Sequence, residues 1–147
     1  MILGIGNGER GDDAAGLLVA RRLKHLASNT IRVEEAEAAG PELIDLWDGV
    51  QTLVIIDAVT SGKEAGGVCR FDVAQGPLPA IFPRHSTHLF SLAATIELAR
   101  ALHCLPDRTI VYGIEGRQFD IGQQLSEGLR QSIENVANRI IAEIDVI

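Results

Sequence analysis

The chain has few cysteines and no long apolar run. Its two cysteines, Cys69 and Cys104, are far apart in the 147-residue sequence and form no C-x-x-C pair. A metal knuckle or redox dithiol is therefore excluded, and we expect both thiols to be reduced packing residues. No apolar run approaches the roughly 18 residues that span a bilayer, and the apolar start at residues 1–5 is too short for a signal peptide. These absences predict a soluble, cytoplasmic protein.

Positive charge is also in short supply. The sequence has 13 Lys and Arg against 20 Asp and Glu, which gives a formal net charge of -7. An acidic protein is repelled by nucleic acid and by anionic membrane surfaces, so neither is an expected partner. A neutral, basic or metal-bearing partner fits this charge better. The length and the 46% hydrophobic content predict one domain over residues 1–147, because a chain of this size can bury a substantial core.

Two common hydrolase motifs are missing. The sequence contains no G-x-S-x-G, which marks a serine nucleophile elbow, and no H-E-x-x-H, which marks a zinc protease helix. Any hydrolytic chemistry must therefore come from another arrangement of side chains.

The opening sixteen residues carry the strongest pattern that is present. They read Met1-Ile-Leu-Gly-Ile-Gly-Asn-Gly-Glu-Arg-Gly-Asp-Asp-Ala-Ala-Gly16. We interpret them as a buried strand, a tight glycine turn and the first turn of a helix. Asp12 and Asp13 then stand at the carboxyl end of a strand, where open α/β sheets bind their ligands. The simplest alternative is that one of the two carboxylates is a helix N-cap.

The same glycines also satisfy a dinucleotide-binding pattern. Residues Gly6 to Gly11 match G-x-G-x-x-G, which places a pyrophosphate at a helix N-terminus. Here that position carries Glu9, Asp12 and Asp13, whose charges repel an anion. A nucleotide-binding enzyme that uses the Gly6–Gly11 loop is therefore kept only as an alternative.

Strand and helix signals alternate along the rest of the chain. An antiparallel edge strand at 66–73 follows the strand at 52–56 too closely for a helical crossover, so we predict a hairpin-like loop between them. Five strands and four helices predict an α/β fold, a three-layer α/β/α sandwich whose twisted five-stranded sheet is mostly parallel with one antiparallel edge strand. The expected helices cover residues 13–27, 40–47, about 86–99 with Ser86 as N-cap, and 125–144. The other expected strands cover residues 1–5, 31–33 and 107–114.

Two further polar residues lie where this fold would bind a ligand. Asp57 directly follows four large aliphatic residues, and His88 would stand in the first turn of the helix that Ser86 caps. If the strand order begins 2-1-3, Asp13 and Asp57 face each other across the crevice at the switch point. With His88 they form an open set of ligands that suits a divalent transition ion. The alternatives are that Asp57 caps the turn at Ser61-Gly62 and that His88 is a polar surface residue.

These motifs together resemble the hydrogenase maturation proteases, which remove a C-terminal extension from the large-subunit precursor of nickel-iron hydrogenases. The resemblance rests on three segments of this sequence. They are Leu3-Gly-Ile-Gly-Asn7 with Gly11-Asp-Asp13 and Gly16; Ile56-Asp-Ala58 with Gly66-Gly-Val68; and the S-x-H element Ser86-Thr-His88. Glu35-Ala-Glu-Ala38 departs from the family's D-G-G-T-like stretch, and Ala14-Ala15 stands where many members begin with Gly. The difference at residues 35–38 affects a segment that is thought, in this family, to help recognise the target protein.

The resemblance implies a cytoplasmic, monomeric endopeptidase whose partner is the large-subunit precursor. It assigns Asp13, Asp57 and His88 as both the nickel-binding and the catalytic residues. The nickel is supplied by the precursor, so cleavage follows nickel insertion, and no other cofactor is implied. An aspartyl-type mechanism and a metal-polarised carbonyl or water both remain open. A non-catalytic metal-binding maturation chaperone is the second alternative.

Overall fold

The computed structural model describes residues 1–82 and 91–145. Strands and helical segments alternate along these residues. In chain order they are β1 (Ile2–Ile5), η1 (Gly11–Ala14), α1 (Ala15–Leu26), β2 (Val33–Ala36), α2 (Leu43–Leu46), β3 (Thr52–Val59), β4 (Val68–Asp72), η2 (Val73–Gln75), α3 (Leu92–Ala101), β5 (Arg108–Glu115) and α4 (Glu127–Asp145).

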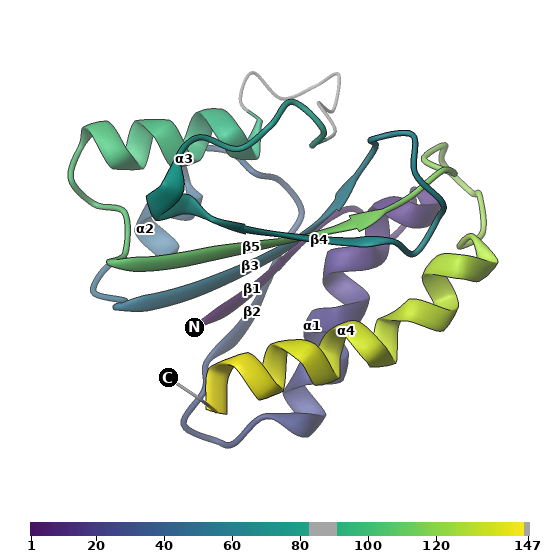
Figure 1. The fold of residues 1–147 in the computed structure, drawn as a ribbon, viewed down its shortest axis with the longest axis horizontal. Coiled ribbons are helices and arrows are strands. Elements are labelled where there is room, and N and C mark those ends of the chain that lie inside the picture. The colour runs from purple at the N-terminus through teal and green to yellow at the C-terminus, as the bar shows by residue number, and fades with distance from the viewer. Residues whose placement is uncertain (83–90, 146–147) are drawn as a thin grey trace.

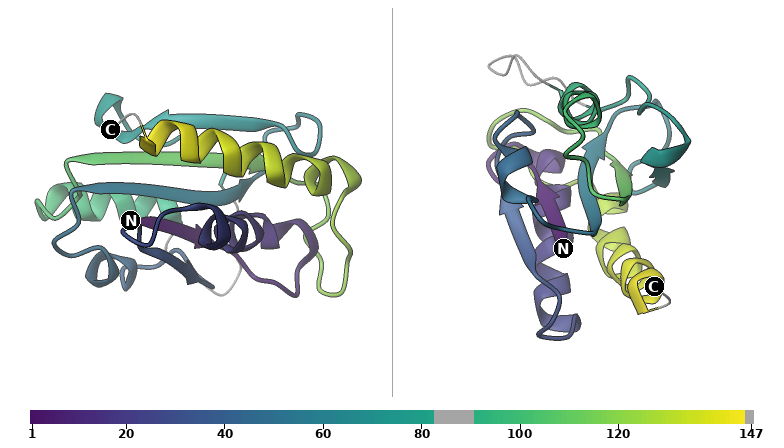
Figure 2. Two further views of the ribbon diagram at one scale, coloured as in Figure 1. Left: turned by 90° about the horizontal axis from the view of Figure 1, so that it is seen from below. Right: turned by 90° about the vertical axis from the view of Figure 1, so that its left-hand side faces the viewer.

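The five strands form one sheet in the order β2-β1-β3-β5-β4. The pairs of β1 with β2, β1 with β3, and β3 with β5 are parallel, and β4 pairs antiparallel with β5. Helices α1 and α4 cover one face, while α2 and α3 cover the other (Figure 1). The right-hand view of Figure 2 shows these three layers end-on. The predicted fold class is confirmed, and the strand order begins 2-1-3, which is the condition under which Asp13 and Asp57 were expected to face each other.

Alternation along the strands divides the core between the two faces. Ile2, Val54 and Ile110 pack toward α1 and α4, whereas Leu53, Ile55 and Val111 pack toward α2 and α3. In β3, every residue from Leu53 to Val59 is buried, as expected for a central parallel strand with helices on both faces.

Strand β3 is longer than its apolar run predicted. It continues past Ile56 to Val59 because β5 pairs with it as far as Val59 opposite Glu115. Asp57 therefore lies within the strand rather than just beyond it. By alternation its side chain is on the same face as Leu53 and Ile55, the face that α3 covers.

The predicted hairpin-like link to β4 is wrong. The partner of β4 is β5, which lies between β3 and β4 in the sheet. Alternation and spacing identified a strand over residues 68–72, but neither indicates which neighbour a strand will have. Helix α3 crosses the sheet and brings β5 alongside β3, so the edge position is left to β4.

Helix α3 also begins later than predicted. Its first residue is Leu92 and its N-cap is Ser91, whose Oγ accepts a hydrogen bond from the Ala94 backbone N–H at 3.2 Å. The prediction that Ser86 caps this helix, with His88 in its first turn, is wrong. The apolar pattern begins in the sequence at Leu89, so it favoured Ser86, which precedes it, over Ser91, which lies within it. Ser86 and His88 themselves lie outside the described residues.

Helix α1 starts directly against the backbones of two strands. A Cβ on Gly16 would lie 2.3 Å from the carbonyl oxygens of both Ile5 and Ile56, so only glycine fits at this position. A Cβ on Gly4 would meet the Gly16 carbonyl oxygen at 2.3 Å. The start of α1 is therefore held at the junction between β1 and β3, which fixes the position of η1 just before it.

The far end of α4 is fastened to the sheet by Glu143. Its carboxylate accepts hydrogen bonds from Arg70 and from the Tyr112 hydroxyl, and lies 3.5 Å from Arg108. The Arg70 hydrogen bond, opposed by burial and helped by the Tyr112 hydrogen bond, lowers the pKa of Glu143 to about 2. Within the described residues, no helix is long and apolar enough to cross a membrane.

Candidate functional site

Two of the predicted site residues are brought together at the carboxyl edge of the sheet. Asp57 projects from β3 and Asp13 lies in η1, directly after the turn that ends β1. Both are buried, with Asp57 only 5% exposed. Burial, and next the negative charge of Asp13, raise the pKa of Asp57 well above its ordinary value. The two carboxylates therefore repel each other in a poorly hydrated site at the switch point of the sheet.

The glycine turn fixes Asp13. The backbone N–H of Asn7 donates to Asp13 Oδ2 at 2.9 Å, and the Asn7 side chain accepts from the Glu9 N–H at 2.9 Å. A Cβ on Gly6 would lie 1.9 Å from the Asp13 carbonyl oxygen, so this position requires glycine. In a dinucleotide site, backbone N–H groups of such a turn face phosphate. Here one of them binds a carboxylate of the same chain, which argues against the nucleotide alternative.

Asp12 has a different role from its neighbour. Its buried carboxylate accepts hydrogen bonds from the backbone N–H groups of Arg117 (2.7 Å), Gln118 (3.0 Å) and Ser126 (2.7 Å), and from Ser126 Oγ (2.5 Å). Burial alone would raise the pKa of Asp12, but these hydrogen bonds outweigh it and hold the pKa below its ordinary value. Asp12 thus binds η1 to the loop between β5 and α4.

The helix-cap alternative is wrong for both aspartates. Neither η1 nor α1 has a hydrogen bond from a capping side chain. Sequence analysis missed the role of Asp12 because its partners are more than a hundred residues away. No local pattern signals them.

The turn at Ser61-Gly62 is held by a residue that sequence analysis did not single out. Glu115 accepts hydrogen bonds from the N–H groups of Ser61 (2.8 Å) and Gly62 (3.1 Å) and from Ser61 Oγ (2.7 Å). Asp57 instead accepts from the N–H of Ala58 at 2.8 Å. The alternative in which Asp57 caps this turn is therefore wrong. The position of Glu115 at the end of an apolar strand was the available signal.

The carboxylates of Asp13 and Asp57 fit a divalent cation, but only these two of the three predicted ligands are among the described residues. Among residues 1–82 and 91–145, no three His, Cys, Asp or Glu side chains converge as a metal site. Asp13 and Asp57 supply oxygen ligands whose mutual repulsion a cation would relieve. The third predicted ligand, His88, lies outside the described residues.

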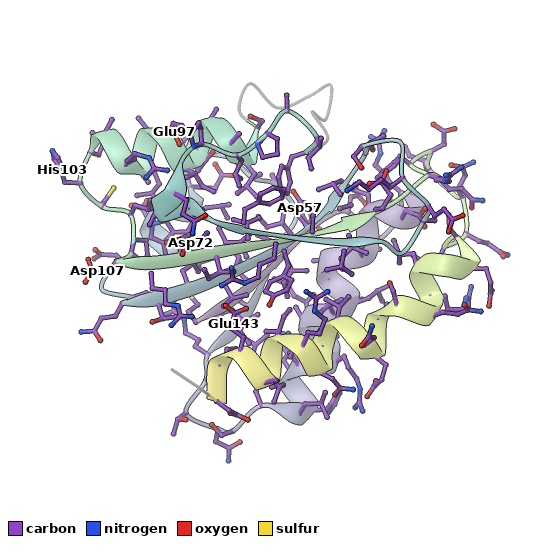
Figure 3. All side chains as sticks on the ribbon, in the orientation of Figure 1. Asp57, Asp72, Glu97, His103, Asp107 and Glu143 are labelled. Atoms are coloured by element: carbon purple, nitrogen blue, oxygen red, sulfur yellow. The ribbon has the colours of Figure 1, made fainter. Side chains whose placement is uncertain are left out.

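Neither cysteine has the surroundings of a nucleophile, although Cys69 is in the same row of the sheet as Asp57, with Gly113 between them. Cys69 Sγ donates to the Gly113 carbonyl at 3.6 Å, and burial raises the pKa of its thiol, which disfavours the nucleophilic thiolate. Cys104 follows His103 in sequence, but its Sγ donates to the Ala99 carbonyl at 3.6 Å. Figure 3 shows His103 at one end of the molecule, well separated from Asp57. Neither thiol has a catalytic environment.

The segment at residues 35–38, which differs from the family's usual sequence, contacts α1 through Glu35. Glu35 lies in β2 and forms ion pairs with Arg21 at 3.0 Å and Lys24 at 3.2 Å. The hydrogen bond from Arg21, opposed by burial and joined by that from Lys24, lowers the pKa of Glu35. Its carboxylate is therefore occupied within the chain.

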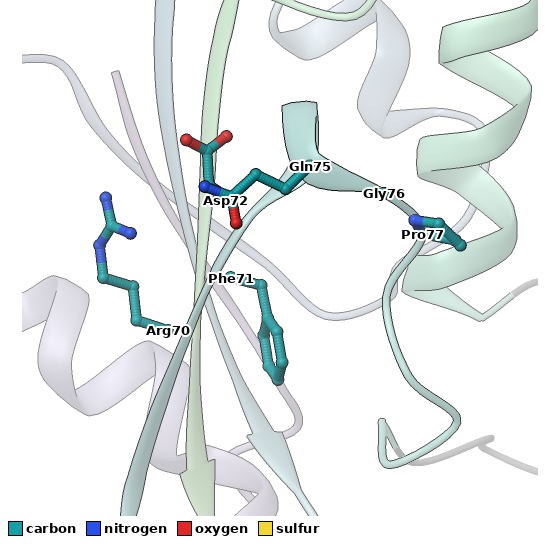
Figure 4. Close-up of a pocket in the computed structure, with 6 residues that line it drawn as sticks. All are labelled: Arg70, Phe71, Asp72, Gln75, Gly76 and Pro77. Carbon is teal, nitrogen blue, oxygen red and sulfur yellow. The ribbon is translucent and has the colours of Figure 1, made fainter.

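A cavity of about 210 Å³ lies at the edge strand, lined by residues that include Arg70, Phe71 and Asp72 (Figure 4). Arg70 and Phe71 point to opposite sides of β4. Both charged groups are engaged, since Arg70 pairs with Glu143 and Asp72 accepts from the Ala74 N–H at 3.0 Å. This cavity therefore offers no reactive group.

Comparison with known proteins identifies the family of this chain. The family model for hydrogenase maturation proteases matches residues 17–143, a span that contains Asp57 and His88 and begins just after Asp13. The hydrogenase 2 maturation protease of Escherichia coli (strain K12) is 23% identical over 147 residues, which cover 98% of this chain and 89% of that protein.

Solved structures show the same fold. The NiFe hydrogenase maturation protease HycI from Thermococcus kodakarensis KOD1 superposes with a TM-score of 0.74 and 27% identity, covering 96% of this chain and 88% of that one. The hydrogenase maturating endopeptidase HybD from E. coli gives a TM-score of 0.77 and 20% identity, covering 98% and 90%. The chain therefore belongs to the hydrogenase maturation protease family.

Proposed function

We propose that this protein is an endopeptidase that removes the C-terminal extension of a nickel-iron hydrogenase large-subunit precursor after nickel has been inserted. The observation that carries the proposal is the Asp13–Asp57 pair at the switch point of the sheet. Burial, and next the charge of Asp13, raise the pKa of Asp57, so ionising both carboxylates of the pair is unfavourable. Membership of the maturation protease family supplies the reaction class.

The pair gives a physical reason for acting on loaded precursor. Nickel is part of the substrate, and Asp13, Asp57 and His88 are the residues proposed to bind it. A cation between Asp13 and Asp57 neutralises their repulsion, whereas a nickel-free precursor leaves the repulsion in place. The carboxylates would therefore favour loaded precursor over unloaded precursor. A carboxylate oxygen of the pair that is not itself a nickel ligand can accept a proton from the attacking water.

The test compares nickel-loaded and nickel-free precursor, incubated with the protein and analysed by mass. We expect shortening of the loaded precursor only. Asp13→Asn, Asp57→Asn and His88→Ala should each reduce cleavage at least about tenfold, by analogy with the losses that follow weaker changes around metal sites. Asp107→Asn is a matched control, because Asp107 is exposed and lies just before β5, well separated from Asp57 (Figure 3). His85→Ala is the control for His88.

Three outcomes would contradict the proposal. Equal cleavage of both precursors would show that cleavage does not require nickel. Normal cleavage by the Asp13, Asp57 and His88 variants would show that these residues do not form the active site. Binding of loaded precursor without any loss of mass would instead support the non-catalytic chaperone.

A further inference from the structure

A second cavity opens at the carboxyl edge of the sheet, between two loops. Its volume is about 340 Å³. The loop after β3 contributes Thr60, Gly62 and Lys63, and the loop after β5 contributes Gly116, Arg117 and Phe119. Figure 1 shows these loops at the same end of the molecule. Neither the family resemblance nor the proposed chemistry assigns this cavity a role.

The cavity is at the same edge as the Asp13–Asp57 pair. Asp57 is opposite Gly113 in the register of β3 and β5, and the next outward pair on that face joins Val59 to Glu115. The Gly116 N–H donates to the Val59 carbonyl at 3.0 Å, so the cavity begins about 7 Å beyond Asp57 along the strand. A peptide bound at the carboxylate pair reaches it within about three extended residues.

Two cations stand at this cavity. Lys63 and Arg117 are both exposed, and Arg117 Nη2 donates to the Lys63 carbonyl oxygen at 3.0 Å, which joins the two loops. The ion pairs found among residues 1–82 and 91–145 include neither side chain. Glu115 also lines the cavity, but its carboxylate is buried and occupied by Ser61 and Gly62. The groups left to a ligand are therefore positive.

Phe119 adds an apolar wall. Its ring lies against Gly116, where a Cβ would be 2.7 Å from Phe119 Cζ. Two cations beside an aromatic ring suit a side chain with an aliphatic stem and a terminal carboxylate. In a chain with a net charge of -7, such a positive site counters the general repulsion of an acidic ligand.

We infer that this cavity is a specificity subsite that binds an acidic side chain of the peptide substrate, within a few residues of the cleaved bond. The inference rests on the proposed function, because it takes the ligand to be the precursor. It assigns Lys63 and Arg117 to substrate binding and not to bond cleavage.

The test uses Lys63→Met, Arg117→Met and the double variant on nickel-loaded precursor. The matched control is Arg22→Met, which removes a cation of α1 that pairs with Glu134 and has no assigned role in the site. We expect the double variant to raise KM about tenfold with kcat little changed, while Arg22→Met behaves as wild type. Raising the salt concentration from about 0.05 to about 0.5 M should raise KM for wild type but not for the double variant.

A second set of variants, in the precursor, identifies the acidic side chain that the cavity binds. Each Asp and Glu around the cleavage site of the precursor is changed to its amide. One change should raise KM for wild type and have no further effect on the double variant, because both remove the same contact. Unchanged KM in the double variant, or amide changes that act equally on both enzymes, would overturn the inference. Failure of wild type to shorten loaded precursor would instead overturn the proposed function.

Discussion

At the scale of single residues, Asp57 makes folding dependent on pH. Its pKa is raised above the ordinary value of 3.8, first by burial and then by Asp13. A carboxyl group with a raised folded-state pKa leaves stability intact below its unfolded pKa and lowers it as pH rises through the folded pKa. We expect Asp57→Asn to raise Tm by a few degrees at about pH 7 and progressively less toward pH 4. Thermal melting across that range measures the effect, and a gain independent of pH would contradict it.

Two nearby glycines give a matched pair of substitutions. In Gly6→Ala the new Cβ would meet the Asp13 carbonyl oxygen at 1.9 Å, whereas in Gly8→Ala its nearest neighbour is Leu17 Cδ1 at 3.9 Å. We expect Gly6→Ala to destabilise the fold by about 2 kcal/mol or more and to impair cleavage. Gly8→Ala should stay within about 0.5 kcal/mol of wild type. Denaturant unfolding measures the stability of both variants. Equal losses of stability would show that the close backbone contact is not at Gly6.

At the scale of elements, η1 depends on Asp12. Asp12→Ala leaves the buried N–H group of Ser126 and the partly buried N–H groups of Arg117 and Gln118 without their acceptor. We therefore expect a loss of about 3 kcal/mol or more, rather than the roughly 1 kcal/mol of a lost helix cap. Ser126→Ala removes only the hydroxyl donor and should destabilise the protein less. Urea unfolding of both variants tests this, and a loss no larger than that of a cap would refute the role of Asp12.

Element η1 also shows which structural features the sequence patterns do not reveal. Hydrophobic periodicity located α1 and α4 well, because their apolar stripes are set by local spacing. It did not separate Asp12 from Asp13, since the partners of Asp12 lie in a distant loop. It also placed the start of α3 at Ser86 instead of Ser91, because the apolar pattern in the sequence already begins at Leu89.

At the scale of the whole molecule, the alternation of strands and helices predicted the layers, whereas the start of the strand order entered only as a condition for the site. The neighbour of β4 was not predictable, because it depends on where α3 returns the chain. Of the three predicted site residues, Asp13 and Asp57 are brought together by the parallel pairing of β1 with β3. The roles of all three in binding nickel and in cleavage stay a prediction.

The contacts of Asp12 have a consequence for motion. Loops without regular structure usually exchange their amide hydrogens with solvent quickly, since small openings expose them. The amides of Arg117, Gln118 and Ser126 are tied to a buried carboxylate, so they can exchange only when η1 itself moves. Arg117 belongs to the cavity and η1 carries Asp13. An opening that releases this loop therefore disturbs Asp13 and the cavity at Arg117 together.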